Sequence, residues 1–300
     1  YVISGNAYGT SWSISSSEYI AENHKEKIRQ IIKDIDYIAS NYKSESEISQ
    51  INMNYSQYQF ISKDLFKILK VAKEVENLSN GYYNIMLGKV SSSLGFAPNF
   101  GKKTLQEIAT SYDLDEKNNS LIRYSENWFD LSSIAKGYAV QKIHNYLSKN
   151  NLNNHLIDIG GEIIISGSKK GKPWNIGIQN PLSKIESSTI TINNGKYEFL
   201  AIASSGEYRN FIYDNSGNKI THTINPKTLT SINNDVLSVT VISETSATYA
   251  DAFATAFNAM GVDNAMKVSN ENNISTMMIY RDKNNVNTIY SDKWYDLFYE

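Results

Sequence analysis

The stretch YADAFATAF, residues 249–257, predicts the helix around which the rest of the chain is organised. It combines small and aromatic residues, contains no proline, and is followed by Gly261, a residue typical of helix ends. Asp251 and Thr255 are four residues apart, so they share one face about one turn from each other. A carboxylate and a hydroxyl are hard oxygen ligands, which Mg²⁺ binds together with phosphates and water. The alternative is an exposed Asp251 next to a core Thr255.

Composition and charge exclude several classes of protein. With 41% hydrophobic and 20% charged residues, the 300-residue chain can form a sizeable core, and its length suits one large domain or two small ones. A net charge of −2 gives no basic surface for nucleic acid, and no run of about 18 apolar residues predicts a membrane span. The absence of cysteine excludes disulfides and thiolate metal sites, and the four histidines lack HExxH-like spacing.

Two long helices are predicted upstream of the 249–257 stretch. Isoleucines recur at three- and four-residue spacing over residues 18–40, with residues 15–17 as serine N-caps. A second helix is predicted over residues 63–78, capped by Ser62 and ended by Asn80 and Gly81. Residues 44–52 between them are predicted to be a polar connector.

Short strands are scattered between the helices. They are predicted over residues 7–14, 120–124, 128–131, 156–167, 174–181, 189–192, 197–203, 236–242, 277–280 and 288–290, with a short helix over 104–111. A turn at Asn194 and Gly195 is expected to pair 189–192 with 197–203. Because no regular βαβ alternation is present, we expect an α+β fold, with a largely antiparallel mixed sheet flanked by helices.

A second notable segment is DLSSIAKGYAV, residues 130–140. Ser132 or Ser133 can cap a helix that reaches about Leu147, and Lys136 falls in its first turn. A helix N-terminus has unpaired N–H groups and a partial positive charge, so this segment could bind a phosphate. An ordinary capped helix with a solvated lysine is the alternative.

Two further segments contain candidate ligand-binding groups. In LIDIGGEIIISG, residues 156–167, two strands flank a glycine pair, and Glu162 is either a surface charge or an acceptor for a hydroxyl. The strand in AIASSGEYR, residues 201–209, runs into a polar loop that includes Ser205 and Gly206. His222 precedes an Asn-Pro turn, although a lone histidine is usually structural or exposed.

Together these segments resemble, in order, the ApbE-type flavin transferases (FAD:protein FMN transferases). The resemblance rests on seven motifs of this sequence over residues 7–268: YGT (8–10), SEISQIN (46–52), DLSSIAKGYA (130–139), IDIGGEIIISG to the proline (157–181), ASSGEYR (203–209), HTINPKT (222–228) and ADAFAT (250–255). Each motif is weak alone, but seven in the right order rarely occur by chance.

The resemblance implies an ApbE-like fold in a single flavin transferase domain over residues 1–300. It also implies a bacterial, extracytoplasmic enzyme, either periplasmic or on the outer face of the bacterial membrane. It implies lipid anchoring through an N-terminal anchor absent from this chain, which opens on YVISG without a signal peptide. The implied reaction uses Mg²⁺ and FAD, releases AMP, and moves FMN onto a threonine or serine of a partner flavoprotein. Some relatives instead hydrolyse FAD to FMN and AMP.

The resemblance also implies roles for individual residues. Asp251 and Thr255, with main-chain oxygens near Ala135 and Ala254, would hold the metal, and Lys136 and His222 would lie at the pyrophosphate. Catalytic roles are thereby implied for His222, Lys136 and Asp251. The implied FAD site further includes Tyr8, Gly9, Thr10, Asn84, Gly161, Glu162, Ser205 and Gly206.

Five positions depart from the family pattern. Tyr8 replaces a methionine, Leu229 a glycine and Gln141 an aspartate, and Asn84 and Met86 replace the polar pair of an FDIT stretch. These departures concern the flavin site more than the metal site. They leave two alternatives to transfer: an Mg²⁺-dependent FAD pyrophosphatase, and a non-catalytic FAD-binding or trafficking protein.

Overall fold

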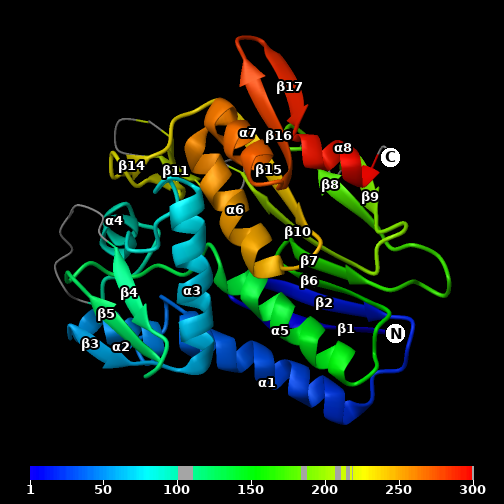
Figure 1. The fold of residues 1–300 in the computed structure, drawn as a ribbon, viewed down its shortest axis with the longest axis horizontal. Coiled ribbons are helices and arrows are strands. Elements are labelled where there is room, and N and C mark those ends of the chain that lie inside the picture. Colours follow the sequence, from blue (N-terminus) through cyan, green and yellow to red (C-terminus); the bar gives the residue numbers. More distant parts are fainter. Residues whose placement is uncertain (101–110, 184–187, 207–210, 214–216, 218, 299–300) are drawn as a thin grey trace.

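The central element of the fold is an eight-stranded sheet, seen in a computed structural model that describes residues 1–100, 111–183, 188–206, 211–213, 217 and 219–298 (Figure 1). All strand pairs among these residues are antiparallel. The order is β1 (Val2–Ala7), β2 (Thr10–Ser16), β6 (His155–Ile159), β7 (Glu162–Ser166), β10 (Phe199–Ser205), β15 (Val236–Ser243), β16 (Ser275–Asp282) and β17 (Asn285–Tyr290).

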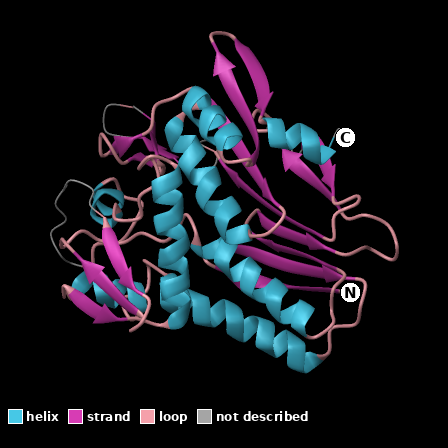
Figure 2. Ribbon diagram, viewed as in Figure 1, coloured by secondary structure: helices cyan, strands magenta, loops and turns pink. Residues whose placement is uncertain are grey.

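Both faces of this sheet are covered. Successive side chains of a strand point to opposite faces, so one strand can contribute to a core on each side. In β10, Ala201 and Ala203 join the main core, whereas Leu200 and Ile202 join a second core on the opposite face. The main core is closed by α1 (Glu22–Ala39), α3 (Lys63–Leu78), α5 (Ala135–Lys149) and α6 (Ala247–Met260), the long helices of Figure 2. The second is closed by β8 (Asn175–Gln179), β9 (Ser188–Asn193) and α8 (Asp292–Phe298).

Smaller elements surround these layers. A three-stranded sheet has the order β3 (Tyr58–Phe60), β5 (Ser120–Arg123) and β4 (Tyr112–Asp115). The other elements are α2 (Glu47–Met53), α4 (Gly88–Ser93), α7 (Val262–Glu271), β11 (Phe211–Tyr213), β12 (Lys219–Thr221), β13 (Ile224–Asn225) and β14 (Thr230–Ser231). No helix within the described ranges is long and apolar enough to cross a bilayer.

Several predictions from the sequence are confirmed. The fold is α+β with an antiparallel main sheet, and α3 spans the predicted residues 63–78, with the Ser62 hydroxyl accepting a hydrogen bond from the Leu65 N–H. The 249–257 stretch lies within α6, which ends at Gly261 with a φ of +75°. The Gly160–Gly161 pair forms the turn between β6 and β7.

Other predictions are wrong, for identifiable reasons. Serines 15–17 do not cap α1: β2 continues to Ser16 because it pairs with β6, and the helix begins at Glu22. Residues 44–52 are not merely a connector, since Ser46 caps the short helix α2, whose Ile48 and Ile51 are buried. Residues 128–131 form no strand. The helix predicted over 104–111 falls largely outside the described residues.

The predicted pairing of 189–192 with 197–203 is also wrong. β9 pairs with β8, whereas β10 pairs with β7 and β15. The cause is the buried Asn194, which accepts a hydrogen bond from the Trp174 N–H and donates to the carbonyls of Gly167 and Tyr197. These bonds fix the course of the chain from β9, which packs on one face of the main sheet, to β10, which is a strand of that sheet.

A buried histidine pair gives a prediction about acid stability. His155 Nδ1 faces the Leu152 carbonyl at 2.8 Å and must donate to it, so its Nε2 accepts from His144 Nδ1 at 3.0 Å. Burial lowers the pKa of both rings to about 4. In the unfolded chain a histidine has a pKa of about 6.5. Between pH values of about 6.5 and about 4 the unfolded chain therefore binds more protons than the folded one, so the free energy of unfolding falls as the pH drops through this range. We expect His144→Gln combined with His155→Gln to flatten this dependence in urea unfolding measured across that window; an equally steep profile would contradict the assignment.

Candidate active site

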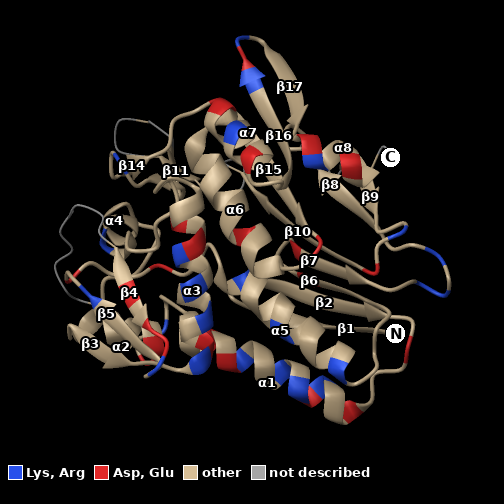
Figure 3. Ribbon diagram, in the orientation of Figure 1, with Lys and Arg blue, Asp and Glu red and all other residues tan. Residues whose placement is uncertain are grey.

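The N-terminus of α5 meets α6 at a very close crossing. The Gly137 N–H donates to Asp251 Oδ2 at 2.8 Å. A Cβ atom on Gly137 would lie 2.5 Å from the Ala247 carbonyl oxygen and 2.6 Å from Asp251 Cβ, so only glycine fits without displacement. Asp251 therefore occupies the positive end of α5, where an anion is favoured. It is the one charged residue of α6, as Figure 3 shows.

A second buried carboxylate faces the same helix end. Glu162, at the start of β7, forms an ion pair with Lys136 and is only 3% exposed, and Asp251 is 5% exposed. Burial raises the pKa of both carboxyl groups, and the Lys136 ammonium opposes this shift. With both carboxyls ionised, two buried negative charges share one lysine, so the site has a net charge of −1. Such a site suits an additional cation.

Two β-turns lie side by side next to this pair. The Gly160 N–H donates to the Ser11 carbonyl at 3.1 Å, and a Cβ on Gly160 would lie 2.7 Å from Thr10 Cγ2. Tyr8 and Gly9 form the β1–β2 turn, both with positive φ, and the Tyr8 hydroxyl donates to the Ile32 carbonyl of α1 at 2.7 Å. Thr10 is thus brought close to the Gly160–Gly161 turn, whereas the Tyr8 hydroxyl is held by α1.

The segment that contains Asn84 lies against the entry to α5. The Asp130 N–H donates to the Ile85 carbonyl at 2.6 Å, and the hydroxyls of Tyr83 and Ser133 are 3.0 Å apart. The predicted serine cap of α5 is therefore wrong: Ile134 occupies the cap position and provides no side-chain bond. The Asn84 amide oxygen accepts the Met86 N–H at 2.7 Å, which shapes this loop.

His222 lies on a bend between β12 and β13. Its ring meets Phe96 edge to face, with ring centroids 6.4 Å apart. The adjacent Thr223 is buried, and its hydroxyl accepts a hydrogen bond from Asn258 of α6, which also donates to Ser205 at the end of β10. Gly206 follows Ser205 and is half-buried. The histidine segment and the Ser205 loop thus meet at α6.

The other predicted metal ligands lie on the same two helices. Thr255 is half-buried one turn after Asp251, Ala254 is buried beside it, and Ala135 opens α5. The described residues contain no group of three or more histidine, aspartate or glutamate side chains suited to a metal. A metal at Asp251 would therefore depend on hydroxyl, main-chain and phosphate oxygens, a donor set that Mg²⁺ accepts.

Two of the unusual positions have clear structural roles. Leu229 has a φ of +56°, a conformation that favours glycine, and it packs near Leu87 and Ile224. Gln141 accepts the Ala247 N–H at 2.8 Å and so caps the first turn of α6 from α5. The departure at Gln141 therefore helps to fix the crossing that positions Asp251.

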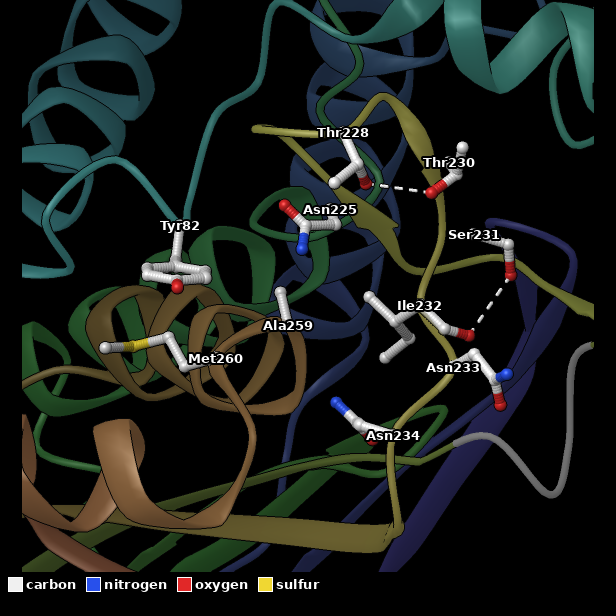
Figure 4. A pocket seen from close by; sticks show the side chains of 10 residues that line it. All are labelled: Tyr82, Asn225, Thr228, Thr230, Ser231, Ile232, Asn233, Asn234, Ala259 and Met260. Carbon is white, nitrogen blue, oxygen red and sulfur yellow. Dashed lines mark hydrogen bonds between the residues drawn. The ribbon is translucent and has the colours of Figure 1, made fainter.

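A cavity of about 300 Å³ opens at the C-terminal end of α6 (Figure 4). Its wall consists mainly of amides and hydroxyls, and it is lined by Tyr82, Asn225, Thr228, Thr230, Ser231, Ile232, Asn233, Asn234, Ala259 and Met260. The Lys227 ammonium lies 3.9 Å from the centroid of the Tyr82 ring. Asn234 links the cavity wall to α6 because its amide donates to the Asn258 carbonyl at 2.8 Å. None of the predicted site residues lines this cavity.

Two residues of this site were not predicted from the sequence. Gly137 could have been suspected because a glycine in the first turn of a helix is costly unless another backbone comes close. Asn258 lies seven residues after Asp251 on the same helical face, and it is a polar residue in an otherwise apolar stretch. Its partners, Ser205 and Thr223, could not be inferred from spacing along the chain.

Comparison with known proteins places the chain among flavin transferases. A model described as the ApbE family matches residues 8–278. A FAD:protein FMN transferase from Haemophilus influenzae is 32% identical over 308 aligned positions, covering 94% of this chain and 87% of the relative. One from Vibrio cholerae is 31% identical over 295 positions, covering 93% and 87%.

Solved structures agree with this result. The flavin transferase ApbE from Vibrio cholerae superposes with a TM-score of 0.84 at 27% identity, covering 99% of this chain and 98% of that one. The ApbE protein from Thermotoga maritima gives a TM-score of 0.83 at 25% identity, with the same coverage. The agreement extends over nearly the whole of each chain.

Proposed function

The chain belongs to the ApbE family, and we propose that it is an Mg²⁺-dependent FAD:protein FMN transferase. It transfers FMN from FAD to a threonine or serine hydroxyl of a partner flavoprotein and releases AMP. The observation that supports this most is the buried cluster of Asp251, Lys136 and Glu162 at the crossing of α5 and α6. A buried cluster of this kind is typical of a functional site.

The cluster fits a divalent cation. When both of its carboxyl groups are ionised, they exceed its one lysine by one negative charge, and Thr255 lies one turn from Asp251. In this proposal Asp251, the Thr255 hydroxyl and main-chain oxygens of Ala135 and Ala254 hold Mg²⁺. When bound, Mg²⁺ would neutralise charge that develops on the pyrophosphate as it is cleaved.

The remaining residues bind and orient FAD. Lys136 and the N-terminal N–H groups of α5 attract the pyrophosphate, because a helix N-terminus and an ammonium both favour anions. His222 donates a hydrogen bond to a phosphate oxygen. Thr10, Gly161, Glu162, Ser205 and Gly206 border the FAD pocket, and Tyr8, Gly9 and Asn84 shape its adjoining loops. The acceptor hydroxyl then attacks the phosphorus of the FMN half, the bond from that phosphorus to the bridging oxygen breaks, and AMP leaves with that oxygen as a phosphate anion. The proton of the hydroxyl passes to solvent.

The direct test is incubation with FAD, Mg²⁺ and a threonine-containing acceptor protein. We expect AMP release together with an acceptor whose mass rises by that of a covalently attached FMN. Free FMN and AMP with an unmodified acceptor would identify an FAD pyrophosphatase instead. Retention of intact FAD without AMP release would identify a binding or trafficking protein.

The same proposal includes an extracytoplasmic location with lipid anchoring of the natural protein. A chain of 300 residues without cysteine is compatible with an oxidising compartment. Fractionation of cells that express the natural gene would test this, and recovery of the protein only with soluble cytoplasmic markers would contradict it.

Lys136→Ala should slow AMP release at least about tenfold, or about 1.4 kcal/mol of transition-state stabilisation. From the sequence alone, little change in thermal stability is expected. The structure predicts a loss of stability, because the variant leaves the buried Glu162 carboxyl without its lysine. The double variant Lys136→Ala with Glu162→Gln should therefore regain stability without regaining rate. If the double variant recovered the rate, the role of Lys136 would be limited to neutralising the Glu162 carboxylate.

His222→Asn tests the role of the histidine. Asparagine keeps a hydrogen-bond donor but cannot act as a base, so measurable transfer should remain if His222 contacts a phosphate. Single-turnover FMN transfer and FAD binding should be measured on the same preparation. A variant that binds FAD but is as inactive as Asp251→Asn is expected to be would favour the alternative, in which His222 takes the proton of the acceptor hydroxyl.

A further inference from the structure

Asn258 lies near the C-terminal end of α6, on the helix face that also includes Asp251. It follows Asp251 by seven residues, so Asp251, Thr255 and Asn258 form one stripe along the helix. Asn258 is 0% exposed, and the other buried residues of α6 are apolar except for Thr248 and Asp251. Burying an amide is unfavourable unless it is hydrogen-bonded, so its bonds determine what it contributes.

The side-chain amide of Asn258 joins two segments that are distant in sequence. Its Nδ2 donates to Ser205 Oγ and to Thr223 Oγ1, both at 3.3 Å. An amide NH₂ has two hydrogens, so one group can serve both hydroxyls, and each hydroxyl keeps its own proton for a further bond. On its main-chain side Asn258 accepts the Asn234 amide at 2.8 Å.

We propose that Asn258 is a positioning residue that holds His222 and the Ser205 loop against the face of α6 formed by Asp251 and Thr255. Thr223 is adjacent to His222 and is 3% exposed, so anchoring its hydroxyl restricts the main chain from which the imidazole extends. This inference rests on the proposed function, because it assigns His222 a contact with the pyrophosphate. A small displacement of such a group costs rate more than binding.

The test begins with Asn258→Leu, which removes both donors at nearly constant volume. We expect kcat for AMP release to fall at least about tenfold while the Kd for FAD changes less than about threefold. Asn194→Leu is the matched control, since it removes a buried amide with three hydrogen bonds that lies away from the site. It should lower stability but leave kcat of the folded enzyme within about threefold. An equal loss of kcat in Asn194→Leu would overturn the proposal.

A double-mutant cycle tests whether Asn258 acts through His222. In a His222→Ala background, Asn258→Leu should cost less than about threefold, because the side chain that it positions is already gone. Equal costs in both backgrounds would overturn the proposal. Thr223→Val removes one acceptor without altering α6, so it should reproduce the loss of kcat and the non-additivity even if Asn258→Leu does not fold.

A measurement independent of activity separates this inference from the proposed function. The chain has four histidines, so its imidazole NMR signals are few, and His222→Asn assigns one of them. Asn258→Leu or Thr223→Val should shift or broaden the His222 signal, and Asn194→Leu should leave it unchanged. An unmoved His222 signal would overturn the positioning role. A shifted signal in a protein that releases no AMP would support that role while refuting the transferase activity.

Discussion

Asp251→Asn is expected to reduce AMP release from FAD at least about a thousandfold, about 4 kcal/mol of transition-state stabilisation, while the protein stays folded. The variant loses the only carboxylate proposed as a metal ligand. Its amide oxygen can still accept the Gly137 N–H, which Asp251 accepts at 2.8 Å. Removal of Mg²⁺ from the unmodified protein with EDTA should have the same effect and should be reversed by added Mg²⁺.

The matched control for this variant is Asp64→Asn. Asp64 of α3 also accepts hydrogen bonds from α5, at 2.7 Å from both the Tyr138 hydroxyl and Lys142 Nζ, but it has no proposed role at the metal. We expect a modest loss of thermal stability with AMP release within about threefold of the unmodified protein. Full activity of Asp251→Asn, or of the unmodified protein in EDTA, would refute the metal site.

The sequence predicted best those features that depend on local patterns. Residues 63–78 form a helix because their apolar stripe, the Ser62 cap and the Asn80–Gly81 end all agree. The Gly160–Gly161 turn and the helix around Asp251 are local in the same sense. Four-residue spacing places Asp251 and Thr255 on one face of a helix, and first-turn position places Lys136, without knowledge of the fold; their roles toward a ligand stay predictions.

Features that depend on distant contacts were missed. Ser133 has the composition of a cap, but its hydroxyl faces Tyr83, and the α5 N–H at Gly137 is satisfied by a carboxylate 114 residues away. β9 and β10 are adjacent in sequence and yet pair with different strands, because Asn194 has partners on both sides of the turn. Asn258 interrupts an apolar stretch, but nothing local indicates that it joins Ser205 to Thr223.

Gly137→Ala is expected to destabilise the protein and to inactivate the part that still folds. In an ordinary helix this substitution is favourable by about 0.5–1 kcal/mol, because alanine loses less backbone entropy. Here the new methyl group would lie 2.5 Å from the Ala247 carbonyl oxygen, a backbone atom that moves only with the whole of α6. Overpacking of this kind costs about 1–3 kcal/mol, so we expect a net loss near the upper end of that range.

The same shift of α6 should cost activity beyond the loss of folded protein. The methyl group would also lie 2.6 Å from Asp251 Cβ, so the bond from the Gly137 N–H must lengthen and the carboxylate must leave the end of α5. Urea unfolding gives the stability, and AMP release per folded molecule gives the activity. Lys149→Ala, an exposed substitution at the C-terminal end of the same helix, should leave both within error. A Gly137→Ala protein as stable and active as the unmodified one would mean that α5 and α6 are not held in contact at this point, and Asp251 would then lose the helix end that fixes its position.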